Sequence, residues 1–132
     1  MKPAYSWYSE LVKPSFAPPS WLFGYVWSVL YVVIAITFVR VFYLAIMRVV
    51  PGIVALPFVL NLVFNFSFTP LQFGLQNNYL AAVDILCILG TLIWAIIAIW
   101  PYSRLLAYAQ LPYLLWVIFA TVLQLTITWL NR

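Results

Sequence analysis

Long stretches of this chain carry no charged residue, and they restrict its fold more than any other feature. The first runs from Ser15 to Val39 and the second from Val49 to Val83. Each is longer than the roughly 20 apolar residues that cross a bilayer as a helix. Charged residues make up 6% of the chain, whereas about a quarter of the residues in a soluble domain are charged. The sequence therefore predicts an integral membrane protein built from helices, which satisfy their own backbone hydrogen bonds in lipid.

Turn-forming residues divide the chain into predicted membrane helices. Breaks are expected at three places: Arg48 with Pro51 and Gly52, Gly74 with Asn77 and Asn78, and Pro101 with Ser103 and Arg104. The four helices then span about 21–42, 53–73, 79–100 and 105–130. Short connections favour an all-α antiparallel bundle, a single domain over residues 1–132 with both ends on one side of the membrane. Basic residues are balanced between the two sides, so the positive-inside rule assigns no orientation.

The proline-rich segment over residues 1–20 precedes the first predicted helix. Pro14, Pro18 and Pro19 each fix φ and lack a backbone donor, so a helix cannot run through them. We expect an irregular lid there, with Ser20 capping a helix that begins at Trp21. No short apolar run ending in small residues opens the chain, so we expect no signal peptide.

Aromatic and amide side chains recur with helical spacing on three of the predicted helices. The three sets are Phe23, Trp27 and Tyr31 on the first helix, Asn61, Asn65, Phe68 and Gln72 on the second, and Tyr113, Trp116, Ala120 and Leu123 on the last. Two interpretations stay open. The amides and rings hold neighbouring helices together, at about 0.6 kcal/mol per polar contact, or they line a cavity for a ligand.

The residues that ordinary enzyme chemistry needs are scarce. The chain has no histidine, one cysteine and two carboxylates, Glu10 and Asp84. This composition excludes a Ser-His-Asp triad and a His/Cys metal site. Cys87 has no second cysteine with which to form an intrachain disulfide. The basic residues stand singly at predicted helix ends, which is typical of interfacial anchors rather than of nucleic-acid binding.

Asp84 is the only carboxylate inside a predicted span and lies about one turn from the start of the third helix. One interpretation places it near the membrane interface, bonded to backbone or to a neighbouring tyrosine, where the helix dipole favours negative charge. The other makes it a proton-coupling site, since ionisable groups inside membranes are commonly functional.

A family resemblance is carried by segments that follow one another along nearly the whole chain. They are WYSELVKPSFAPPSWLFGYVWSVLY from Trp7, NLVFNFSFTPLQF from Asn61 with LAAVD from Leu80, and LPYLLWVIFATVLQLTITWLN from Leu111. The chain resembles the tryptophan-rich sensory protein and translocator protein family, also called TspO/MBR or the peripheral benzodiazepine receptor family. The resemblance implies a cavity that binds tetrapyrroles such as protoporphyrin and haem, cholesterol-like lipids and benzodiazepine-type ligands. It implies contacts from Tyr8, Pro18, Phe23, Trp27, Tyr31, Asn65, Phe68, Trp116 and Ala120.

Two departures from the family pattern qualify this resemblance. The family ordinarily has five membrane helices, and this chain resembles a short form that begins in the loop after the first. We therefore expect a partner, a lipid or a second copy to take the place of that helix. Residues 125–132 contain no tyrosine, so the proposed cholesterol motif is absent, which argues against sterol binding.

The resemblance favours binding of tetrapyrroles in an aromatic cavity, for sensing as a receptor or for transport, with no required cofactor. An alternative is an enzyme that degrades porphyrin photochemically with Trp27 and Trp116 as its catalytic residues, and another is a small structural or transport bundle. Expected partners are membrane lipid, a porphyrin-type molecule and a second copy, because small-residue and aromatic faces favour helix association. Nucleic acid is not an expected partner.

Overall fold

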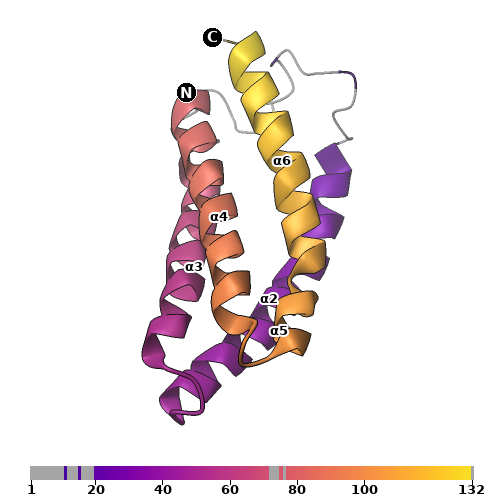
Figure 1. Cartoon of the computed structure of the whole chain (residues 1–132). Coiled ribbons are helices and arrows are strands. Elements are labelled where there is room, and N and C mark those ends of the chain that lie inside the picture. Colours follow the sequence, from indigo (N-terminus) through magenta and orange to yellow (C-terminus); the bar gives the residue numbers. More distant parts are fainter. Residues whose placement is uncertain (1–10, 12–14, 16–19, 72–74, 76, 132) are drawn as a thin grey trace.

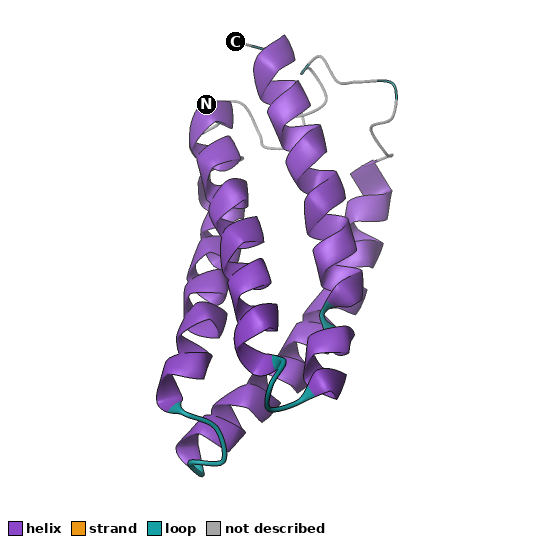
Figure 2. Cartoon of the chain, in the orientation of Figure 1, coloured by secondary structure: helices purple, strands orange, loops and turns teal. Residues whose placement is uncertain are grey.

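The described part of the chain is helical and contains no strand. The computed structural model describes residues 11, 15, 20–71, 75 and 77–131. The elements are α2 (Ser20–Ile46), the 3-10 helix η1 (Gly52–Ala55), α3 (Leu56–Thr69), α4 (Asn78–Ile99), α5 (Arg104–Ala109) and α6 (Leu111–Leu130). The long helices run up and down beside one another (Figures 1 and 2). The predicted all-α membrane bundle is confirmed, while most of the predicted lid lies outside the described residues.

The first predicted helix is longer than expected, because α2 continues to Ile46 rather than ending near residue 42. Arg40 does not stop it: the residue is exposed, and its guanidinium carbon lies 5.5 Å from the centre of the Tyr43 ring. The helix ends where Arg48 adopts a positive φ of 60°. The amides of Val49 and Val50 then donate to the Leu44 carbonyl at 2.9 and 3.3 Å, which satisfies the helix end.

Two prolines that the sequence placed inside longer spans lie in the first turns of helices. Pro57 follows η1 at the start of α3, and Pro112 follows a break at Gln110 at the start of α6. Proline is tolerated there because the first helical amides have no intrahelical partner. The predicted spans 53–73 and 105–130 are therefore each divided into a short helix and a longer one, and α3 ends at Thr69.

The centre of the bundle is α4, which packs between α3 and α6. Its buried side chains include the alanines Ala81, Ala82 and Ala95, which allow close approach of neighbouring helices. Helix α2 packs instead on η1 and α5 through its C-terminal half. There Phe38 also meets the ring of Phe58, at the start of α3, edge-on at 4.9 Å. Helix α2 slants from beside α6 at its N-terminal end to the turn before α3 at its other end (Figure 1).

The outer faces of the helices are apolar. Three helical segments are long and apolar enough to cross a membrane, Gly24–Ile46, Asn78–Ile99 and Arg104–Leu130, and a shorter apolar helix covers Gly52–Phe68. Exposed side chains along α2 include Val29, Val32, Ile36 and Val39. An outer surface of this kind is stable in lipid and unfavourable in water. The protein is thus an integral membrane protein, as predicted.

Candidate functional site

Tyr113 lies at the centre of a buried hydrogen-bond network. Its side chain is 0% exposed, and its hydroxyl donates to Asn61 Oδ1 at 2.8 Å and accepts from Asn65 Nδ2 at 2.7 Å. The two asparagines lie four residues apart on α3, so both amides face α6. One phenol therefore satisfies two buried amides, which would otherwise be costly in an apolar interior.

The network continues to the other two long helices. On α4, Asn61 Nδ2 donates to the Ile88 carbonyl at 3.0 Å and to Thr91 Oγ1 at 3.2 Å. On α2, the Tyr31 hydroxyl donates to Asn65 Oδ1 at 3.2 Å. Side chains of α2, α3, α4 and α6 are thus joined by one continuous set of hydrogen bonds.

Aromatic rings of α2 lie next to this network. The Trp27 ring centre is 5.5 Å from that of Tyr31, and it meets the Tyr113 ring edge-on at 6.5 Å. Tyr31 also contacts the Phe66 ring, with the centres 6.4 Å apart. The sequence spacing that placed Trp27 and Tyr31 on one face is confirmed, and that face meets the amides of α3.

Asn65 retains hydrogen-bonding capacity beyond the bonds described above. A carboxamide offers two N–H donors and two acceptor lone pairs. The bond to Tyr113 uses one donor, and the bond from Tyr31 uses one lone pair. Because both partners also fix the amide orientation, the remaining donor and lone pair of Asn65 have defined directions.

The other predicted contact residues occupy related positions. Trp27, Phe68, Trp116 and Ala120 are partly buried and pack against the same hydrophobic core. Tyr8, Pro18 and Gln72 lie outside the described residues, and so does the side chain of Phe23. The structure thus joins Tyr31 to Asn65 by a hydrogen bond and to Trp27 by a ring contact. It places Phe68, Trp116 and Ala120 around the same core.

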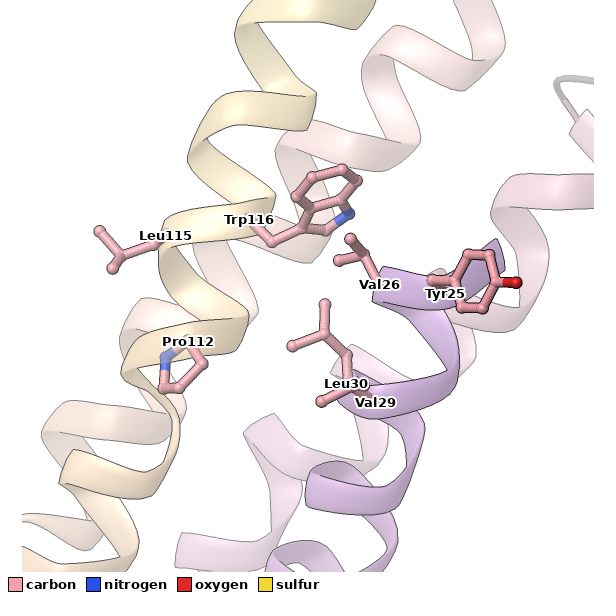
Figure 3. Close-up of a pocket in the computed structure, with 7 residues that line it drawn as sticks. All are labelled: Tyr25, Val26, Val29, Leu30, Pro112, Leu115 and Trp116. Atoms are coloured by element: carbon pink, nitrogen blue, oxygen red, sulfur yellow. The ribbon is translucent and has the colours of Figure 1, made fainter. Parts of the chain in front are cut away.

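A groove of about 500 Å³ separates α2 from α6. Seven residues line it: Tyr25, Val26, Val29, Leu30, Pro112, Leu115 and Trp116. The Trp116 indole extends from α6 toward Val26 and Leu30 of α2, whereas Tyr25 and Leu115 lie at the outer margins (Figure 3). Trp116 therefore forms part of the wall between this groove and the core.

Asp84 is buried, with 5% of its side chain exposed. It belongs to the face of α4 that also buries Ala81, Ile85 and Ile88 between the neighbouring helices. Its Oδ2 atom has no hydrogen-bond partner in the described part of the chain. The rotation of α4 thus turns this residue toward the neighbouring helices, while its predicted position near the membrane interface stays a prediction. No group of histidine, cysteine and carboxylate side chains that could hold a metal occurs among the residues described.

Sequence reasoning did not identify Tyr113 or Thr91 as part of this centre. Tyr113 was placed on an aromatic face with Trp116, and its hydroxyl was not assigned a partner. The signal was the pair of asparagines one turn apart, since two buried amides on one face require polar partners on a facing helix. Which helix supplies those partners depends on tertiary packing.

The fold and the site together define the class of protein: a helical membrane bundle with a buried centre of aromatic and amide side chains. Within that class, the chain belongs to the TspO/MBR family, whose model matches residues 1–130. The predicted family resemblance is confirmed.

Individual relatives agree with this assignment. The chain is 38% identical to "Tryptophan-rich protein TspO" of Archaeoglobus fulgidus over 96% of this chain and 80% of the relative. It is 35% identical to the protein of the same name from Bacillus cereus, over 96% and 81% of the two chains. Identity to the human "Translocator protein" is 32%, over 89% of this chain and 70% of the relative.

Proposed function

We propose that the protein binds tetrapyrroles such as protoporphyrin or haem, or related flat apolar molecules, for sensing or transport. The observation that carries this proposal is that the Tyr31 ring contacts the Trp27 ring while its hydroxyl donates to the oriented amide of Asn65. A flat conjugated ligand gains from stacking on indole and phenol rings. Its polar edge or ring N–H groups match the remaining donor and lone pair of Asn65.

The positions of Phe68, Trp116 and Ala120 support the same proposal. Each packs against the core that also contacts Trp27, so a ligand beside Trp27 has apolar walls from α3 and α6. Binding sites of this kind are mostly apolar, with a few placed polar groups that set orientation. The name of the human relative supports transport as one purpose of binding.

The test is a titration of the protein with protoporphyrin in nanodiscs, followed by the shift of the porphyrin absorption band. Wild type is compared with Trp27→Phe, Trp116→Phe and a control, Trp94→Phe, whose ring is 42% exposed on α4. Losing an indole stack weakens binding by about 1 kcal/mol, roughly fivefold in Kd. We expect this weakening for Trp27→Phe and Trp116→Phe and an unchanged Kd for Trp94→Phe.

Equal saturable binding by all four proteins would contradict the proposed site. Repeating the titration in light separates binding from chemistry. Loss of the porphyrin bands in light, abolished by Trp27→Phe, would instead support the alternative of photochemical degradation.

A further inference from the structure

The groove between α2 and α6 lies in the membrane-spanning part of the bundle. Its lining consists of aliphatic and aromatic side chains and one proline. Val29 and Leu115, on its two walls, are 64% and 67% exposed. The medium around such a surface is the hydrocarbon of the bilayer. An occupant that enters from outside the bundle must therefore be apolar over the length of the groove.

The α2 wall of the groove leads along one helix face to a basic side chain. Val29, Ile36 and Arg40 are spaced i, i+7 and i+11, so they share a face, and all three are exposed. From Val29 to Arg40 the helix rises about 16 Å. Arg40 lies six residues, or about 9 Å along the helix, before the end of the Gly24–Ile46 span. Its long side chain can extend from there toward the phospholipid head groups.

The charges at that end of the bundle favour an anion. The guanidinium of Arg40 lies over the ring of Tyr43, closer to the C-terminal end of α2. Arg48 follows α2, and Arg104 lies over the Trp100 ring at the turn between α4 and α5, at the same end of the bundle (Figure 1). In the described part of the chain the only carboxylate is Asp84, near the opposite end of α4.

We propose that an anionic phospholipid binds this surface, with its phosphate at Arg40 and one acyl chain in the groove between α2 and α6. A guanidinium pairs strongly with phosphate oxygens, and the acyl chain fills the apolar groove by van der Waals contact with its walls. A second copy of the protein is a poorer match, because two copies inserted in the same direction bring like charges together at this end. The groove shares Trp116 with the proposed tetrapyrrole site, but Arg40, Val29 and Leu115, which the test below changes, are not part of that site.

The test uses native mass spectrometry of the delipidated protein after incubation with phosphatidylglycerol or phosphatidylcholine of identical acyl chains. We expect wild type to retain one phosphatidylglycerol in preference to phosphatidylcholine. Arg40→Gln should lower phosphatidylglycerol retention about tenfold, since it removes a charge-assisted bond of roughly 1.5 kcal/mol. The matched control, Arg48→Gln, removes the same charge at the same end but off the groove face, and should retain the lipid.

The acyl-chain part of the proposal is tested by filling the groove. Val29→Trp and, from the opposite wall, Leu115→Trp should each abolish retention, whereas Val83→Trp, on the exposed face of α4, should not. Circular dichroism identifies any variant that fails to fold. If one of the two groove variants fails, the variant on the opposite wall provides the test. Equal losses of phosphatidylglycerol retention in Arg40→Gln and Arg48→Gln would overturn the proposed site, because they would show that the lipid is held by general charge attraction. Displacement of the lipid by glycerol phosphate alone, or loss of a dimer peak in Val29→Trp, would also overturn it.

Discussion

The two halves of α2 are held in the bundle in different ways. Its C-terminal half packs on η1 and α5 and buries Phe38 and Val41 almost completely. Its N-terminal half borders the groove and meets α3 through the hydrogen bond of Tyr31 to Asn65 and the ring contact of Tyr31 with Phe66. It meets α6 through the ring contact of Trp27 with Tyr113. Close packing therefore anchors one half of the helix, while directional contacts position the other. The candidate ligand site lies on the half with fewer packing contacts, where an adaptable wall suits a binding function.

The largest loss of stability is expected from removing the Phe58 ring, against which the C-terminal half of α2 packs. Phe58 is 0% exposed and meets Phe38 edge-on. Phe58→Ala leaves a cavity and should lower the free energy of unfolding by about 3–5 kcal/mol, measured by circular dichroism during denaturation in mixed micelles. Phe66→Ala is the control, because that ring is 63% exposed, and should cost about 1 kcal/mol or less. Similar losses in the two variants would show that the C-terminal half of α2 is not held more firmly than the N-terminal half.

The second largest loss of stability is expected in the hydrogen-bond network that the N-terminal half of α2 contacts. Tyr113→Phe removes the hydroxyl between Asn61 and Asn65 and leaves one acceptor and one donor buried without a partner. We expect a loss of about 2 kcal/mol in the free energy of unfolding, measured in the same denaturation experiment. Tyr79→Phe, at a 60% exposed position on α4, should be neutral. A neutral Tyr113→Phe would mean that the asparagines find other partners.

The smallest effect is expected at the contact of α2 with the network. Tyr31→Phe removes one hydrogen bond of 3.2 Å from a side chain that is 42% exposed. The loss in unfolding free energy should be about 0.5 kcal/mol. Because the Asn65 oxygen loses its hydrogen-bond donor, the free energy of protoporphyrin binding should change by more than the free energy of unfolding does. If stability falls as far as in Tyr113→Phe, the two halves of α2 do not differ in the way described.

Much of the architecture was predictable because its signals are local. Long apolar stretches identified the helices, and Arg48 with Pro51 identified the first turn. Pro57 and Pro112 were harder to place, because a proline inside an apolar stretch is compatible with a kink, a break or a first turn. The structure has each of them in the first turn of a helix that follows a short helix.

The site was predictable in part for the same reason. Helical spacing placed Trp27 with Tyr31 and Asn61 with Asn65, and both pairings are observed to share a face. The spacing within one helix says nothing of which residue lies opposite. The hydroxyl of Tyr113 is far from the asparagines in sequence, and the burial of Asp84 depends on how α4 is rotated against α3 and α6.

The sequence by itself determined that this chain is a helical membrane protein, since hydropathy and turn residues act over one helix length. It also determined which residues share each helix face, through the helical period. Only the tertiary structure decided which of those faces meet each other and which meet lipid. The physical reason is that lipid tails and the bundle interior are similarly apolar, so hydropathy does not distinguish the two sides of a helix. The buried amides and the phenol of Tyr113 make that distinction, because they need partners that only a facing helix supplies.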